Sequence, residues 1–79
     1  MKPFIFFQSK SDEYYWFIVT QARFVTEDFT IIEALVLDQA DAVLPNWRSD
    51  TTYFNLEHMT FKEYETQEEL IADNLADVL

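Results

Sequence analysis

Aromatic and β-branched residues dominate the first third of the chain. Residues 3–8 (PFIFFQ) and 14–25 (YYWFIVTQARFV) have this composition, which favours extended strands. The polar segment QSKSDE at 8–13 separates them and predicts the turn of a β-hairpin. Alternation along the second strand gives each face its own apolar row: Tyr14, Trp16 and Ile18 on one face, Tyr15, Phe17 and Val19 on the other. Both faces of this strand therefore require a cover.

The spacing of apolar residues changes in 26–45 (TEDFTIIEALVLDQADAVLP). Apolar side chains recur there at intervals of three and four, as on one face of a helix: Phe29, Ile32, Val36, Ala40 and Val43. Thr26 or Asp28 could cap such a helix, and Pro45 would end it. A strand through FTIIEALVL is the alternative, but the spacing favours the helix.

The last third of the chain predicts further strands and a final helix. Residues 51–61 (TTYFNLEHMTF) are strand-like and could continue to Tyr64; they predict a third strand, with a short fourth strand as an open alternative. Thr66 followed by Glu69 forms a capping-box pattern ahead of apolar residues at helical spacing. The sequence thus predicts one α+β domain over residues 1–79, in the order β-β-α-β-α, with a small antiparallel sheet packed by two helices. If both helices covered one face, a homodimer would cover the aromatic row on the other.

Composition narrows the chemistry that the chain can perform. It has 79 residues and neither Cys nor Gly, which excludes disulfides, thiolate metal sites, phosphate-binding loops and dinucleotide fingerprints. His58 is the only histidine and lies in a strand pattern, where a structural role is usual. We therefore predict no enzyme, no cofactor and no metal site. The short apolar N-terminus lacks the length of a signal peptide or a membrane span, which predicts a cytoplasmic protein.

Negative charge is the strongest feature of the composition. The formal net charge is −10, and residues 63–79 contain no Lys or Arg. On the predicted last helix Glu69, Asp73 and Asp77 follow one another at a spacing of four, which stacks them about 5–6 Å apart. Glu27, Glu33, Asp38 and Asp41 lie on the predicted first helix, away from its apolar stripe. Trp47, in the predicted loop PNWRSD, could be an exposed anchor or could fold over the end of the first predicted helix. The candidate partner-binding residues are drawn from the acids and this loop: Glu63, Glu65, Glu68, Glu69, Asp73, Asp77, Glu33, Asp38, Asp41 and Trp47.

Carboxylates fixed on two helices could imitate the charge of a nucleic acid. DNA carries one negative charge per roughly 1.7 Å of its axis, so an acidic array competes for the Lys and Arg groups that bind phosphates. The sequence predicts an inhibitor that occludes the basic surface of a nuclease or another nucleic-acid-binding protein, and that binds neither nucleic acid nor a membrane. In size, acidity and lack of Cys and Gly, the chain is similar to small inhibitors that phages and mobile elements use against host defence nucleases. The alternative is an interaction or structural module, such as a homodimer or an immunity-like protein, whose acidity serves solubility.

Overall fold

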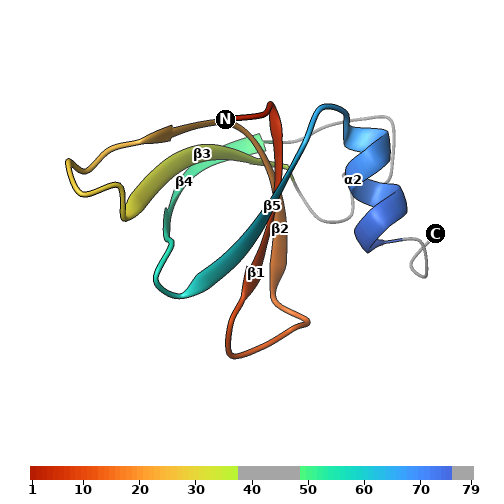
Figure 1. The fold of residues 1–79 in the computed structure, drawn as a ribbon, viewed down its shortest axis with the longest axis horizontal. Coiled ribbons are helices and arrows are strands. Elements are labelled where there is room, and N and C mark those ends of the chain that lie inside the picture. The colour runs from red at the N-terminus through yellow and green to blue at the C-terminus, as the bar shows by residue number, and fades with distance from the viewer. Residues whose placement is uncertain (38–48, 76–79) are drawn as a thin grey trace.

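The computed structural model describes residues 1–37 and 49–75, which form five strands and one helix (Figure 1). The strands are β1 (Phe4–Ser9), β2 (Trp16–Phe24), β3 (Ile31–Leu37), β4 (Ser49–Asn55) and β5 (Met59–Tyr64), and the helix is α2 (Gln67–Asn74). Each strand pairs antiparallel with its neighbours, in the spatial order β4-β3-β2-β1-β5. The described part of the chain is thus mainly one antiparallel sheet.

The sheet curls because its two edge strands are consecutive in the sequence. β4 and β5 lie at opposite edges, yet only residues 56–58 connect them. The connecting turn is closed by two hydrogen bonds, from the His58 N–H to the Asn55 carbonyl (3.0 Å) and from the Glu57 N–H to Asn55 Oδ1 (2.9 Å). The curl brings Phe54 of β4 onto Phe7 of β1, with ring centroids 4.7 Å apart and planes 11° apart. The sheet therefore covers one of its own faces.

Irregular backbone in β2 contributes to this shape. The register with β3 shifts between Thr20 and Arg23, which marks a β-bulge, and Gln21 takes a left-handed conformation with φ of 54°. A bulge bends its strand and increases the local twist, as a strongly curled sheet requires.

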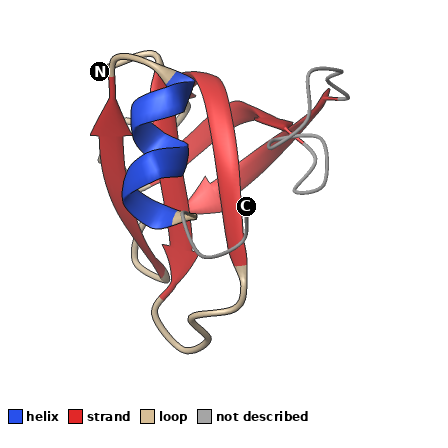
Figure 2. Ribbon diagram, turned by 90° about the vertical axis from the view of Figure 1, so that its right-hand side faces the viewer, coloured by secondary structure: helices blue, strands red, loops and turns tan. Residues whose placement is uncertain are grey.

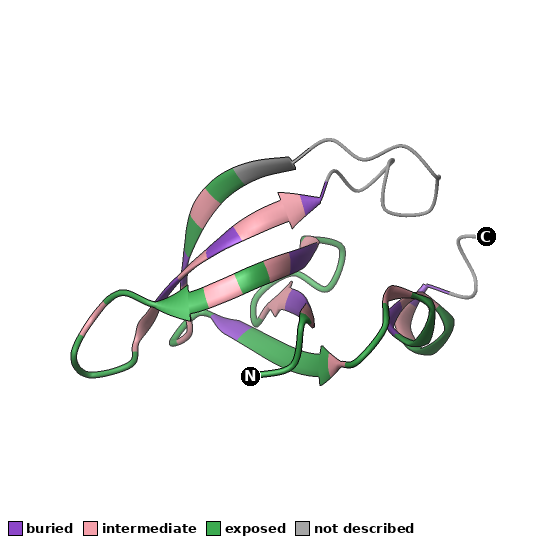
Figure 3. Cartoon of the chain, turned by 90° about the horizontal axis from the view of Figure 1, so that it is seen from above, coloured by how far each residue is buried: buried purple, intermediate pink, exposed green. Residues whose placement is uncertain are grey.

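Two apolar cores lie on the two faces of the sheet. Figure 3 marks the buried residues along the chain. The inner core lies within the curl and consists of Ile5, Phe7, Val19, Ile32, Ala34, Phe54 and Met59. The outer core lies between the sheet and α2, which packs against β1 and β5 (Figure 2). Its members are Phe6, Ile18, Leu37, Leu70 and Leu75. The apolar rows predicted for β2 are confirmed in part, since Trp16 and Ile18 belong to the outer core and Phe17 and Val19 to the inner one.

The predicted fold class is wrong because the first predicted helix is a strand over its described part. Residues 31–37 form β3, which pairs with both β2 and β4. Ile32 and Ala34 point into the inner core, and Leu37 points into the outer core beneath α2. A strand covered on both faces is apolar on both faces, and periodicity alone does not separate such a run from a helix. The order β-β-α-β-α is therefore replaced by five strands followed by one short helix in the described residues.

Other predicted elements are confirmed. The first two strands form the expected hairpin, and α2 begins after Thr66. The segment predicted as a third strand, with a fourth left open, forms the two strands β4 and β5. The curl removes the reason for a homodimer given above, because the sheet itself covers the second aromatic row. Within residues 1–37 and 49–75, no helix is both long and apolar enough to cross a membrane.

Candidate functional site

The acidic side chains lie on the surface with little compensation from cations. Arg23 and Glu33 form the one ion pair among the described residues, with 3.0 Å between Nη2 and Oε1. Glu33 is half-buried, and every other acidic side chain whose burial is described is exposed: Asp12, Glu13, Glu27, Asp28, Glu57, Glu63, Glu65, Glu68, Glu69 and Asp73. The surface therefore carries many carboxylates whose charge no described cation neutralises.

Half of these exposed acids follow one another along β5 and α2. Glu63 lies in β5, Glu65 follows it, and Glu68 and Glu69 occupy the first turn of α2. The hydroxyl of Thr66 caps the helix by accepting a hydrogen bond from the Glu69 N–H at 3.2 Å. The cap and the positive end of the helix dipole both favour acids in this turn. The predicted acidic helix is thus present, and its start is fixed by the predicted cap.

Asp73, in the last turn of α2, has a partner that the sequence did not suggest. The Tyr64 hydroxyl donates a hydrogen bond to Asp73 Oδ2, and the same hydroxyl accepts one from Asn74 Nδ2 at 3.0 Å. Burial raises the pKa of the Tyr64 hydroxyl, and the hydrogen bond to Asp73 raises it further. Because Tyr64 is neutral, Asp73 keeps its full negative charge while its carboxylate is held in place.

Asp73 also borders a surface hollow between α2 and the β1–β2 loop, which we call the acidic hollow. It measures about 440 Å³ and is lined by Phe6, Gln8, Glu13, Tyr14, Trp16, Asp73, Asn74 and Leu75. Two exposed carboxylates, from Glu13 and Asp73, thus share one hollow with aromatic rings. Tyr14 is 83% exposed, whereas Trp16 is half-buried with its ring 5.6 Å from that of Phe6.

The loop that carries Glu13 and Tyr14 is held by its own hydrogen bonds. The Tyr14 and Tyr15 N–H groups donate to the side chain and the carbonyl of Asp12, each at 3.0 Å. Gln8 Nε2 donates to the Glu13 carbonyl at 2.8 Å. Such a loop loses little conformational freedom when a ligand binds, because its shape is already set.

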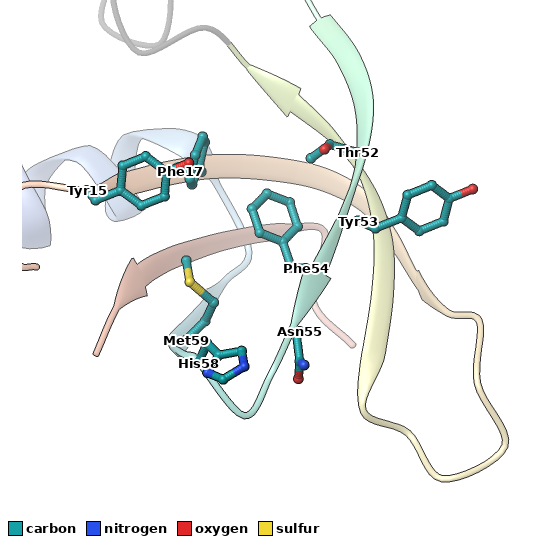
Figure 4. Close-up of a pocket in the computed structure, with 8 residues that line it drawn as sticks. All are labelled: Tyr15, Phe17, Thr52, Tyr53, Phe54, Asn55, His58 and Met59. Atoms are coloured by element: carbon teal, nitrogen blue, oxygen red, sulfur yellow. The ribbon is translucent and has the colours of Figure 1, made fainter. Parts of the chain in front are cut away.

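A second hollow lies at the mouth of the curled sheet, and we call it the aromatic hollow. It measures about 370 Å³, and Tyr15, Phe17, Thr52, Tyr53, Phe54, Asn55, His58 and Met59 line it. Phe17 makes edge contacts with both Tyr15 and Phe54, at centroid distances of 4.9 and 5.2 Å. Figure 4 shows Tyr53 pointing away from these rings, on the other side of β4. The aromatic hollow is thus mainly an opening of the inner core, and its rings hold one another.

The predicted site residues therefore have different outcomes. Glu63, Glu65, Glu68, Glu69 and Asp73 lie on the β5–α2 segment, and four others lie outside the described residues: Asp38, Asp41, Trp47 and Asp77. Glu33 lies on β3 beside its partner Arg23, so its predicted placement on a first helix is wrong. Glu33 also accepts a hydrogen bond from Tyr53, which raises the pKa of that phenol.

Sequence reasoning missed Glu13 and Tyr14 as site residues and Tyr64 as the partner of Asp73. One signal was present, because DEYYW places acids next to three aromatic residues at the predicted end of a turn. Aromatic residues beside acids in an exposed turn are typical of interaction surfaces.

The comparisons with known proteins add no further constraint. No family model matches the chain, and neither a curated protein nor a solved structure matches it. Among the described residues, no group of three or more His, Cys, Asp or Glu side chains is arranged to hold a metal ion.

Proposed function

We propose that this chain is an acidic binding protein that occludes the basic surface of a nuclease or another nucleic-acid-binding protein. One observation carries the proposal: the exposed carboxylates have no cationic partner among residues 1–37 and 49–75, and five of them follow one another along β5 and α2. Lys62 is the only basic residue from position 59 onward. Its amino group donates to Asn74 Oδ1 at 3.5 Å and makes no ion pair with a described residue.

The mechanism is competition for cations that normally bind phosphate groups. A basic cleft attracts nucleic acid through charge, so a rigid acidic surface is attracted to it as well and associates fast at low salt. The proposed surface is smaller than two helices would present, because Glu33 is neutralised by Arg23. It consists of Glu65 and the α2 acids Glu68, Glu69 and Asp73 together with Glu13 of the facing loop, whereas Glu63 shares the other sheet face with its strand partner Ile5. No catalysis is required, and the proposed location is the cytoplasm, where such partners work.

An interaction module with incidental acidity is the second candidate. Partly exposed aromatic side chains favour it, since Tyr15 is 55% and Phe61 is 46% exposed at the two sides of the inner core. Aromatic residues at such positions contribute strongly to protein interfaces. This candidate predicts self-association or partner binding that tolerates salt and ignores nucleic acid.

Charge reversal with a matched control separates the two candidates. We would immobilise the protein, load a cytosolic extract of its natural host at low salt, and elute with a nuclease-resistant DNA duplex. The test variant carries Glu68→Lys and Glu69→Lys, and the control carries Glu27→Lys and Glu57→Lys in loops outside the β5–α2 segment. Each double variant changes the formal net charge from −10 to −6, since each Glu→Lys adds two charges.

The proposal predicts a nucleic-acid-binding protein that the duplex releases and that the test variant fails to capture. The control variant should retain most of the binding, because its charges lie elsewhere. If the duplex releases nothing, or if both variants lose the same partner equally, the β5–α2 acids are not a nucleic-acid-like contact surface.

A further inference from the structure

The geometry of the acidic hollow points to a specific occupant, and we propose that it binds an arginine side chain of the basic partner. This inference rests on the proposed function and adds to it the position and the chemical identity of one anchoring contact. The hollow combines the two groups that recognise a guanidinium, namely carboxylates and aromatic rings, in a single space of about 440 Å³.

The carboxylates stand on two separate rigid elements. Glu13 belongs to the β1–β2 loop, and Asp73 belongs to the last turn of α2. Tyr64 donates to Oδ2 of Asp73, and a carboxylate offers about four lone-pair sites on its two oxygens, so Asp73 keeps the capacity to accept from a ligand. A guanidinium has five N–H donors in a planar fork, and because Glu13 and Asp73 line the same hollow, an arginine inserted there meets acceptors from two elements.

The aromatic rings favour arginine over lysine. Tyr14 extends into solvent at the rim of the hollow, and Trp16 lines it with its ring supported by Phe6. A planar, weakly hydrated guanidinium stacks on such rings while its edge makes hydrogen bonds, whereas an ammonium acts as a compact, strongly hydrated point charge. Lys62, which contacts Asn74, does not line the hollow.

Other occupants fit the chemistry less well. Mg²⁺ and Ca²⁺ take six or more oxygen ligands, and among the described residues no three His, Cys, Asp or Glu side chains are grouped to hold such an ion. A second copy placed with its own hollow against this one would bring like charges together, which is unfavourable. Its Arg23 is engaged with Glu33 and is not a ready donor.

The test uses a short arginine peptide on the intact, ¹⁵N-labelled protein. Acetyl-Gly-Arg-Gly-amide would be titrated by NMR, beside the same peptide with citrulline, which keeps the shape without the charge, and with lysine. We expect the amide signals of Glu13, Tyr14 and Asp73 and the Trp16 indole signal to shift together. Citrulline should bind about tenfold more weakly, and lysine about threefold more weakly, because the first loses both charge contacts and the second loses the planar fork.

Variants locate the contact. Glu13→Gln with Asp73→Asn should weaken arginine binding about fivefold, since each exposed ion pair contributes modestly. The amide oxygen introduced by Asp73→Asn still accepts the Tyr64 hydrogen bond, so the helix end keeps its support. Glu27→Gln with Glu57→Gln, which removes the same charge elsewhere, should cost less than about twofold. Tyr14→Leu keeps the charge and removes an exposed ring, and should weaken binding roughly threefold.

Three results would overturn the inference. These are shifts spread over all acidic residues with equal affinity for arginine and lysine, equal losses in the two double variants, or no shift at the hollow at all. The occlusion proposal is judged separately by duplex release and charge reversal at Glu68 and Glu69. If those succeed while the peptide fails, the β5–α2 acids bind the partner without an arginine anchor in the hollow.

Discussion

The acidic surface depends on the docking of α2, and Leu70→Ala should weaken that docking. Leu70 is completely buried and packs with Phe6, Ile18, Leu37 and Leu75 between the helix and the sheet. An eight-residue helix is not stable on its own in water, so tertiary contacts must hold it. Leu70 is the only buried residue within α2 itself, and the C-capping residue Leu75 supplies the second contact.

The expected cost follows from the burial of this side chain. Buried Leu→Ala substitutions cost roughly 2–5 kcal/mol, depending on how well the surroundings close the cavity. We expect about 2–3 kcal/mol, because a short helix at the edge of the sheet can shift toward the gap. A domain of 79 residues has a total stability of about 4–12 kcal/mol, so the variant should fold but be clearly destabilised. Opening of α2 should then be the cheapest local unfolding event.

Two measurements check this expectation. Urea unfolding followed by circular dichroism gives the free energy of unfolding, and hydrogen exchange with mass spectrometry gives the protection of residues 67–75 relative to β1 and β2. Ala72→Ser on the exposed side of the same helix serves as the control and should change stability by about 0.5 kcal/mol or less. A loss below about 1 kcal/mol for Leu70→Ala, with unchanged protection of α2, would refute the conclusion that Leu70 holds the helix.

Three further predictions concern pH, one turn and salt. The pKa of Tyr64 is raised above its ordinary 10.0 in the folded protein, so its stabilising contribution is complete below that value and declines as pH rises through the folded pKa. Tyr64→Phe should therefore cost about 1 kcal/mol at pH 7 in urea unfolding and make stability less dependent on pH above 10; an unchanged alkaline profile would contradict this. Thr26→Val removes the hydroxyl that accepts hydrogen bonds from the Thr30 and Ile31 N–H groups, each at 3.1 Å, and should lower the free energy of unfolding in urea by roughly 1–3 kcal/mol. The control Thr60→Val on exposed β5 should lower it by about 0.5 kcal/mol, and equal losses in the two variants would contradict the importance of the Thr26 contacts. Raising NaCl from about 0.05 to 0.5 M should increase the melting temperature by roughly 3 °C in scanning calorimetry, because salt screens repulsion among the carboxylates. A lower melting temperature at high salt would contradict the view that this repulsion destabilises the folded protein.

The strands could be predicted from the sequence where residue type and alternation agree. In β1 and β2 the aromatic and β-branched residues alternate across faces that are both covered, and the short polar turn sets the hairpin. The prediction for the β3 segment was wrong because both faces of this strand are apolar, and such an apolar run has the same sequence pattern as a buried helix. The cover for those faces comes from β1 and β5 across the curl and from α2, all distant from β3 in the sequence, so no local pattern records it.

The candidate site was predictable to the extent that it is local. Thr66 and Glu69 marked the start of α2 correctly, and the spacing of Glu69 and Asp73 placed both on that helix. The contact between Tyr64 and Asp73 joins a strand to a helix, and the acidic hollow joins Asp73 to a loop near the other end of the sequence. Such pairs result from tertiary packing, and the linear pattern of charges does not contain them.

The fold offsets part of the cost of its negative charge without neutralising it. Glu68 and Glu69 lie at the positive end of the helix dipole, where an acid gains about 0.3–1 kcal/mol. Asp73 lies near the unfavourable end, and there the neutral Tyr64 hydroxyl supplies a hydrogen bond in place of a cation. Had Lys or Arg side chains served instead, the local field would have been reduced along with the repulsion. Because the helix dipole and a phenol act in their place among the described residues, a partner's arginine would meet carboxylates that no described cation offsets, with that of Asp73 already oriented by Tyr64.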